Sequence, residues 1–202
     1  MAAGWPVRLS HGSVGVRPLV RSDAARIDRI RAENIEWLGP WDASLPPQSG
    51  SPITSQAGLI GYQRRKAREG LAMPFGVTVD GELVGQVTVN SITRGSALSA
   101  SIGYWISKAF AGRQITPLAV AMVSDHLLTT AGLHRVEISI RPENQASIRV
   151  VEKLGFDEIG LARGYLHING DWRDHRIFQV LASDVPHGLV ARLEPPTGSA
   201  AD

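Results

Sequence analysis

The residues with the clearest chemical potential lie where predicted strands run into helices. The first group is Ala111-Gly112-Arg113-Gln114-Ile115-Thr116, between a predicted strand and a predicted helix. Such a turn directs several unpaired backbone N–H groups and the positive end of a helix dipole to one place, which suits a pyrophosphate. Gly112 permits close backbone approach, and Pro117 is tolerated because the first helical turn loses no intrahelical donor. One glycine in a strand–helix connection does not by itself identify a ligand.

The second group is the run from Arg141 to Phe156. Asn144 is a good N-cap, since its side chain can accept a hydrogen bond from an orphan backbone N–H. Apolar residues then recur at helical spacing as far as Leu154, and Gly155 supplies a C-terminal stop. Ser147 lies three residues past Asn144, on the same helix face. We therefore expect a short capped helix that begins with an amide and a hydroxyl side chain close together.

Both groups belong to a regular series of predicted elements. Helices are expected at 22–38, 54–70, 114–130 and 144–154, and strands at 14–20, 75–79, 83–89, 102–106, 135–140, near 159 and at 177–181. In the first helix Ser22-Asp23 is expected to cap an apolar stripe that contains Ile27, Ile30 and Ile35. The order β-α-α-β-β-β-α-β-α-β-β predicts an α+β (mixed α/β) domain, with a central mixed, mostly antiparallel sheet and helices on both faces.

The turns and the ends of the domain can also be placed. Asp80-Gly81 and Asn169-Gly170 predict tight hairpin turns, because both positions of such a turn need φ > 0. Since 202 residues at 43% hydrophobic can bury one core, we expect a single domain. Residues 1–13 are expected to form an N-terminal extension, 14–190 the domain, and the small, polar, Pro-rich residues 191–202 a disordered tail.

Composition excludes several kinds of site. The chain has no cysteine, which removes disulfides, thiol nucleophiles and thiolate metal sites. Its 6 histidines show no paired ligand spacing, so we expect no metal. No apolar stretch approaches the roughly 18 residues that span a bilayer, and no signal core opens the chain, so we expect a cytoplasmic protein. A net charge of +2 gives little support to nucleic-acid binding, and the basic run at 64–68 fits a solvated helix face.

The amino-acid sequences of these segments resemble those of a known protein family. Asn144-x-x-Ser147 followed by Glu152-Lys-Leu-Gly-Phe156 resembles the pantetheine-side motif of the GCN5-related N-acetyltransferases (GNAT), as written in their ribosomal-protein branch. Residues 111–116 resemble the family's Gln/Arg-x-x-Gly-x-Gly/Ala loop, and the predicted order of elements is that of its fold. The segment from Tyr165 to His175 resembles the ribosomal-protein-alanine, RimJ-like members in particular. The resemblance covers about residues 14 to 182.

The resemblance implies acetyl-CoA as co-substrate, without a metal. The pyrophosphate would lie on Gly112, Arg113, Gln114, Ile115 and Thr116, and the pantetheine arm beside Trp105, Ile106 and Asn144. Gln114 replaces the usual second glycine of the loop, and Thr116 the usual alanine. Backbone donors can still bind phosphate if Gln114 keeps a negative φ, with a local difference in the loop. This departure affects the expected affinity for acetyl-CoA more than the expectation that acetyl-CoA is the ligand.

Acetyl transfer needs a neutral amine, a polarised carbonyl and a stabilised leaving thiolate. The family's usual acid, a Tyr seven residues past the motif Asn, is Val151 here, so Ser147 is the candidate to stabilise the thiolate by hydrogen bonding. Related enzymes often carry Glu where this chain has Ser101, which leaves the base open; the reserve candidates are Glu33, Glu36 and His167. An α-amine is roughly a tenth neutral at pH 7, but a lysine is below about one in a thousand. A site without a strong base therefore favours an N-terminal amine.

The resemblance also implies that the first two helices, their connecting loop and the C-terminal hairpin wall the acceptor groove, along which lie Glu33, Trp37, Trp41 and Tyr165. The predicted reaction is direct transfer, in a ternary complex, of acetyl to the N-terminal alanine of a ribosomal or other protein, by a monomer or homodimer. No membrane or direct nucleic-acid partner is expected.

Two alternative functions stay open. A small-amine acetyltransferase, for aminoglycosides or polyamines, needs carboxylates to hold a polycation, and the loop at 37–52 offers only Asp42. A non-catalytic acyl-CoA-binding ribosome-assembly factor would accommodate the departures at Ser101, Gln114 and Val151, and it predicts acetyl-CoA binding without turnover.

Overall fold

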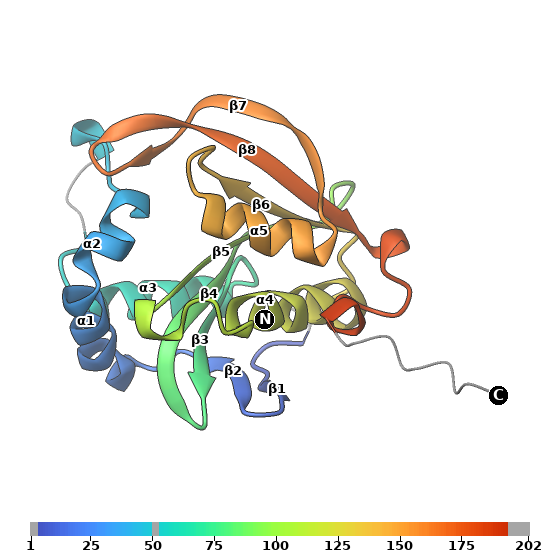
Figure 1. The fold of residues 1–202 in the computed structure, drawn as a ribbon, viewed down its shortest axis with the longest axis horizontal. Helices are drawn as coiled ribbons and strands as arrows, with labels where there is room; N and C mark the ends of the chain where they lie inside the picture. Colours follow the sequence, from blue (N-terminus) through green and yellow to red (C-terminus); the bar gives the residue numbers. More distant parts are fainter. Residues whose placement is uncertain (1–3, 50–52, 194–202) are drawn as a thin grey trace.

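A central eight-stranded sheet organises the computed structural model, which describes residues 4–49 and 53–193. The strand order is β1-β2-β3-β4-β5-β6-β8-β7 (Figure 1). Neighbouring strands are antiparallel except β5 and β6, which are parallel. The strands are β1 (Leu9–His11), β2 (Val14–Pro18), β3 (Met73–Val79), β4 (Glu82–Thr93), β5 (Ser99–Ile106), β6 (Arg135–Ile140), β7 (Asp157–Ile168) and β8 (Asp171–Leu181). The predicted mixed, mostly antiparallel sheet is confirmed.

Helices pack on both faces of this sheet, as expected. One face carries α4 (Ile115–Asp125), which continues into a π-helical turn at His126–Thr130, and α5 (Gln145–Leu154). The other face carries α1 (Ala24–Glu33) and α3 (Gln56–Arg68), whose Ile27 and Ile60 form a small core with Leu19 and Leu83. The short α2 (Ile35–Leu38) follows α1 (Figure 1).

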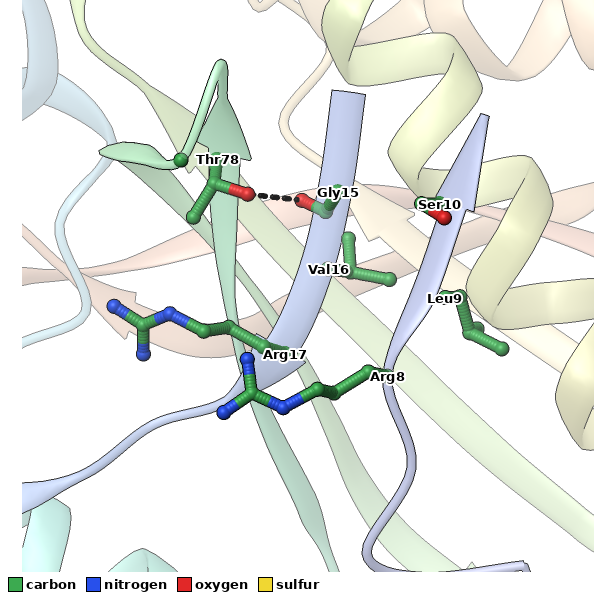
Figure 2. Close-up of a pocket in the computed structure, with 8 residues that line it drawn as sticks. Arg8, Leu9, Ser10, Gly15, Val16, Arg17 and Thr78 are labelled. Carbon is green, nitrogen blue, oxygen red and sulfur yellow. Dashed lines mark hydrogen bonds between the residues drawn. The ribbon is translucent and has the colours of Figure 1, made fainter. Parts of the chain in front are cut away.

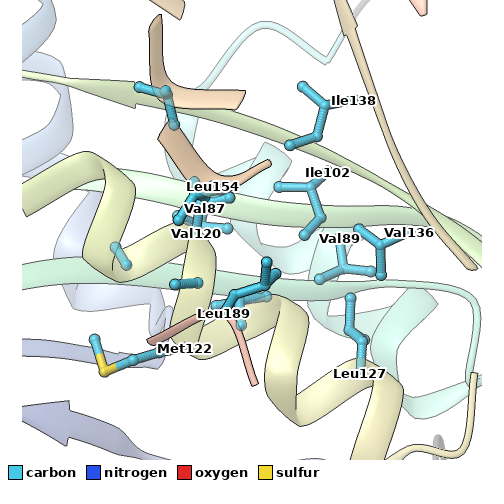
Figure 3. Close-up of a cluster of buried hydrophobic side chains, with 14 of the residues drawn as sticks. Val87, Val89, Ile102, Val120, Met122, Leu127, Val136, Ile138, Leu154 and Leu189 are labelled. Atoms are coloured by element: carbon cyan, nitrogen blue, oxygen red, sulfur yellow. The ribbon is translucent and has the colours of Figure 1, made fainter. Parts of the chain in front are cut away.

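The larger core lies between the sheet and the pair α4 and α5. Alternate residues of the central strands point into it, and Val87, Val89 and Ile102 are at most 3% exposed. Figure 3 shows them together with Val120 of α4 and Leu154 of α5. Full burial of one such side chain contributes about 1.5–3 kcal/mol to folding. This packing fixes the starts of α4 and α5 relative to β5, where the candidate site lies.

Two tight turns confirm the hairpins expected from the Asp-Gly and Asn-Gly pairs. Asp80 and Gly81 have φ of 49° and 84°, and Asn169 and Gly170 have φ of 48° and 83°. Positive φ at two successive residues is what a two-residue hairpin turn requires. The second turn joins β7 to β8 and brings the tip of that hairpin to the loop after α2.

The helix predicted at 22–38 is interrupted at Asn34. This residue has φ −121° and ψ 24°, outside the helical region, and separates α1 from α2. Its buried side chain explains the break, because Oδ1 accepts from Lys108 N at 2.8 Å and Nδ2 donates to Ile30 O at 2.7 Å. Ile35 is consequently 65% exposed, so its predicted place on the apolar stripe is wrong. Tertiary hydrogen bonds outweigh the local periodicity here.

The start of α1 also differs from the expected cap. Asp23 makes no side-chain hydrogen bond to a helix amide. Its carboxylate accepts two hydrogen bonds of 2.8 Å from Arg17 and one of 2.8 Å from Val20 N. A bidentate guanidinium is a stronger partner for a buried carboxylate than a single amide. The predicted cap is therefore replaced by an ion pair that joins β2 to the start of α1.

Segments near the two ends of the chain pack on the domain. Residues 9–11, within the expected N-terminal extension, form the edge strand β1. Residues 191–193, within the expected tail, belong to a 3-10 turn at Val190–Leu193, from which Arg192 donates to Leu154 O at 2.6 Å. The rest of the expected tail, 194–202, lies outside the described residues. Across 4–49 and 53–193, no helix is long and apolar enough to cross a membrane.

Candidate functional site

The parallel strands β5 and β6 separate after a short stretch of pairing. Residues 99–101 pair with residues 135–137, after which β5 runs on to Ile106 while β6 stays paired with β8 as far as Ile140. We call the opening between residues 102–106 and β6 the splay. On that side, β5 has no described strand partner beyond Ser101. Its unpaired N–H and C=O groups can bind a ligand that carries amides, as they would bind a further strand.

The two faces of β5 at the splay have different surroundings. Tyr104 points toward α5, where its hydroxyl donates to Ser147 O at 3.2 Å. Trp105 points the other way and packs on the core under α1 and α3. Because side chains alternate along a strand, Ser101 and Gly103 share the face of Trp105. We call this side the α1 face of the splay, and the side of Tyr104 the α5 face.

The turn before α4 forms a concave row of amides. Gly112 and Gln114 have φ of 74° and 62°. In the described part of the chain, no oxygen accepts a hydrogen bond from the backbone N–H groups of residues 112–116. Left-handed residues at a helix N-terminus turn successive N–H groups inward and make an anion-binding concavity. We call residues 112–116 the amide nest; a methyl group at Gly112 would meet no atom within 4 Å, so the nest is open.

The condition set on Gln114 for phosphate binding, a negative φ, is not met, because its φ is 62°. The left-handed conformation costs a residue with a Cβ about 1–2 kcal/mol, so other contacts must hold it. Gln114 Oε1 accepts a hydrogen bond from Lys153 Nζ, in the last turn of α5, at 2.6 Å. A hollow of about 140 Å³ adjoins this pair and is lined by His11, Gln114, Leu118, Lys153, Val190 and Leu193. The loop therefore keeps a glycine-type backbone at this position.

The start of α5 has the predicted cap. Asn144 Oδ1 accepts from Ser147 N at 3.1 Å, and Gly155 ends the helix with φ of 67°. The Ser147 hydroxyl is half-buried and has no hydrogen bond within the described residues. Val151, one turn further on, is fully buried and offers no donor. Burial raises the pKa of Tyr104, so its phenol stays protonated and ties β5 to α5 through Ser147 O.

On the α1 face, the loop after α2 is fastened to the tip of the β7–β8 hairpin. Ser44 N donates to His167 O at 2.9 Å, and Ser44 Oγ lies 2.9 Å from His167 Nδ1 and accepts from Gly170 N at 2.9 Å. Asn169 N also donates to Asp42 O at 2.9 Å. We call this joined pair of segments the wall. His167, a reserve candidate for the base, has its Nδ1 engaged in the wall.

The predicted aromatic residues lie beside the splay and on the hairpin. Trp37 Nε1 donates to Ile106 O at 3.1 Å, which fixes α2 to the end of β5. The Trp41 ring stacks under the Arg141 guanidinium at 5.3 Å, just beyond the end of β6. Tyr165 is 46% exposed on β7 and meets His175 edge-on, with ring centroids 5.8 Å apart. Trp37 and Trp41 thus lie at the two sides of the splay, and Tyr165 stands on the hairpin.

The carboxylates expected near the groove are scattered. Glu33 and Glu36 are both exposed, and Asp42 is ion-paired with Arg31. Sequence reasoning missed Arg141, which donates to Pro40 O at 2.8 Å and so closes the end of the splay. It also passed over Tyr104, although strand alternation from the buried residues 102 and 106 would have placed that side chain against α5.

A second hollow, of about 320 Å³, lies at the β1 edge of the sheet, on β1, β2 and β3 (Figure 2). Its lining includes Arg8 and Arg17, but Arg17 is already paired with Asp23 at 2.8 Å. Thr78 donates to Gly15 O at 3.3 Å across its floor. None of the predicted site residues lines it, so the splay remains the candidate site.

Comparison with known proteins agrees with this geometry. Residues 13–157 match the acetyltransferase (GNAT) domain family. The chain is 37% identical to Mycobacterium smegmatis RimJ, solved in complex with CoA-disulfide, with a TM-score of 0.89 and 96% of each chain covered. It is 29% identical over 180 residues to the ribosomal protein uS5-alanine N-acetyltransferase of Escherichia coli, covering 88% of this chain and 92% of that one.

A relative with a different acceptor in its name is also similar. The spermidine N(1)-acetyltransferase of Escherichia coli is 29% identical over 165 residues, covering 80% of this chain and 82% of that one. Both Escherichia coli relatives are named as N-acetyltransferases, and the Mycobacterium smegmatis structure holds a coenzyme A derivative. The amide nest, the splay and the capped start of α5 are groups suited to a phosphate and an amide-bearing arm. The chain therefore belongs to the GNAT family and is an acetyl-CoA-dependent N-acetyltransferase.

Proposed function

We propose that this enzyme acetylates the N-terminal amine of a ribosomal or other protein, with alanine as the first residue, by direct attack in a ternary complex. The observation that carries the proposal is the wall on the α1 face, where Ser44 and His167 join two segments far apart in sequence. A joined wall favours a slot for a chain end over an open surface. The similarity to a ribosomal-protein-alanine acetyltransferase supports the same acceptor.

The chain's own groups fit acetyl-CoA, which supplies the activated acetyl thioester when bound. The amide nest, together with the Arg113 side chain, would hold the pyrophosphate. The edge of β5 up to Trp105 and Ile106, where Ile106 O already accepts from Trp37, would pair through its remaining groups with the amides of the pantetheine arm, next to Asn144. The helix α5 connects these two places, since it begins at Asn144 beside the splay and reaches the nest through Lys153. Ten residues at 1.5 Å each make it about 15 Å long.

Ser147 is the candidate to stabilise the leaving thiolate. Its hydroxyl has no other partner among the described residues, and it lies in the first turn of α5, where the helix dipole favours negative charge. Val151 cannot take this role. An α-amine suits such a site better than a lysine, because roughly a tenth of it is already neutral at pH 7.

The carboxylates near the wall disfavour a polyamine as acceptor. Asp42 is paired with Arg31, and Glu143 is paired with Arg141 at 3.2 Å. A polycation held by both carboxylates would have to displace two arginines at once, whereas a single ammonium group would not. An acceptor with one amine is therefore favoured over spermidine or an aminoglycoside.

Within residues 4–49 and 53–193, no three His, Asp or Glu side chains gather closely enough to hold a metal ion.

Thiol release in the presence of acetyl-CoA tests the proposal. The acceptors are Ala-starting peptides, the same peptides N-blocked but bearing lysine, and a set of polyamines and aminoglycosides. We expect turnover with the free Ala-peptides alone. Turnover of only the blocked lysine peptides, or of only the small amines, would reject the N-terminal assignment. Acetyl-CoA binding without thiol release from any mixture would support the assembly-factor alternative.

A further inference from the structure

The α1 face of the splay has one open position on β5. Gly103 is exposed there, and a methyl group in place of its hydrogen would meet no atom within 4 Å. Its neighbours on that face are Ser101 and Trp105. Neither of these side chains can take up a proton at neutral pH. An amine that enters over Gly103 must therefore pass its proton to a group on another strand or to solvent.

Glu137 of β6 is the carboxylate nearest to this position by strand register. It is the direct neighbour of Ser101 in the short parallel ladder, so both side chains project on the α1 face. Two residues along β5 and one strand across separate the Cα atoms of Glu137 and Gly103 by roughly 8 Å. A Glu side chain with one bridging water covers that distance.

The surroundings of Glu137 leave it accessible. Its side chain is 30% exposed and is paired with Arg135, two residues earlier on β6, at 2.6 Å. Beyond the neutral Gln179 of β8, the next charged residue in register on this face is Asp157 of β7. Arg94, in the turn before β5, donates to Ala131 O at 2.8 Å instead. An incoming ammonium group can thus compete with a single guanidinium for this carboxylate.

We propose that Glu137 receives the proton lost by the acceptor amine, in place of a carboxylate at position 101. This inference rests on the proposed acetyl transfer. The amine nitrogen forms a bond to the thioester carbonyl carbon, and the carbon–sulfur bond breaks as the amide forms. Before this attack the ammonium gives one proton to the Glu137 carboxylate, directly or through one water. A second proton passes from nitrogen to the sulfur as the thiol leaves on the α5 face near Ser147.

The test compares Glu137→Gln with Glu158→Gln. Glu158 is also paired with an arginine, Arg176, at 2.6 Å, but it pairs in register with Phe178 and so lies on the opposite face. We expect Glu137→Gln to lower kcat/KM for an Ala-peptide about 100-fold at pH 7, with the deficit narrowing above about pH 9, where the amine arrives neutral. Acetyl-CoA affinity stays within about twofold, and Glu158→Gln behaves as wild type.

Two further measurements separate a proton acceptor from a structural ion pair. Adding Ser101→Glu to Glu137→Gln should restore much of the lost rate, because it returns a carboxylate to the adjacent position on the same face. In calorimetric titrations of the coenzyme A complex, Glu137→Gln should weaken binding of the free-amine peptide several-fold and leave its N-formyl analogue unchanged.

Several results would overturn the role of Glu137. These are wild-type kcat/KM in Glu137→Gln, or an equal loss at every pH that Ser101→Glu does not rescue. If the wild type acetylates spermidine and not peptides, the proposed function fails, and the same pH comparison with spermidine still decides for or against Glu137. A wild type that acetylates neither amine rejects both proposals.

Discussion

The left-handed conformation of Gln114 gives a sharp test of the amide nest. Replacing Gln114 by glycine keeps the backbone conformation without a Cβ, whereas replacing it by valine puts a β-branched side chain where φ is 62°. The two variants therefore separate the backbone geometry of the nest from the side-chain contact with Lys153, because both lose the 2.6 Å hydrogen bond.

Three free-energy contributions set the expected change in the free energy of unfolding of each variant. Glycine removes a left-handed penalty of about 1–2 kcal/mol, but loses about 0.5–1 kcal/mol through the entropy of the unfolded chain. The exposed bond to Lys153 is worth at most about 1 kcal/mol. Gln114→Gly should thus leave the free energy of unfolding within about 1 kcal/mol of wild type. Gln114→Val raises the backbone penalty toward about 3 kcal/mol and also loses the bond, so it should lower Tm by several degrees, at about 2–4 °C per kcal/mol.

Urea unfolding and calorimetric titration with acetyl-CoA measure both effects. We expect Gln114→Gly to bind acetyl-CoA within about threefold of wild type. Gln114→Val should bind at least about tenfold more weakly, a loss of about 1.4 kcal/mol, because its loop must leave the left-handed conformation to relieve strain. If folded Gln114→Val binds acetyl-CoA as tightly as wild type, the inward-turned amides do not hold the phosphate. If Gln114→Gly binds acetyl-CoA much more weakly than wild type, the side chain of Gln114 contributes more to acetyl-CoA binding than its backbone conformation does.

Other variants test the remaining parts of the site and the core. Ser147→Ala should lower kcat roughly 100-fold with little change in acetyl-CoA affinity, since the cap uses the Ser147 amide; an unchanged kcat would remove the hydroxyl from the reaction. Ser44→Ala should raise the KM for an Ala-peptide several-fold and leave acetyl-CoA binding intact, because it loosens the wall at His167. An equal loss of affinity for the peptide and for acetyl-CoA would contradict this. Burial lowers the pKa of His126, so the unfolded chain takes up a proton first as pH falls through about 6.5, and stability is lost below that value. His126→Leu should lose less stability than wild type between pH 7 and pH 5 in urea unfolding, and a parallel decline would contradict that cause.

Much of the fold could be predicted because its signals are local. The Asn144 cap, the Gly155 stop and the Asn169-Gly170 turn each depend on residues within one turn of chain, and all three are confirmed. The order of strands and helices follows in the same way from periodicity. Features set by distant partners could not be predicted. The break at Asn34 depends on Lys108, 74 residues away, and no periodicity within α1 indicates that bond.

The same distinction between local and distant determinants applies to the candidate site. The position of the amide nest follows from a strand, a glycine and a helix start, so the sequence identifies it without tertiary knowledge. The conformation of Gln114 does not follow, because it is held by Lys153 from the end of another helix. The wall is equally non-local: Ser44 and His167 are 123 residues apart, and their contact depends on the length of the β7–β8 hairpin.

The three departures from the family pattern have a common structural feature, which bears on how the proposed active site works. Gln114 is steadied by Lys153 of α5, and Ser101 stands beside Glu137 of β6. Val151 lies one turn from Ser147, whose hydroxyl is free within the described residues. In each case a side chain that we propose to compensate for the departure lies close to the departing residue. The departures therefore argue for a rearranged active site, and substitution of the neighbours, rather than of the departing residues, is the way to decide.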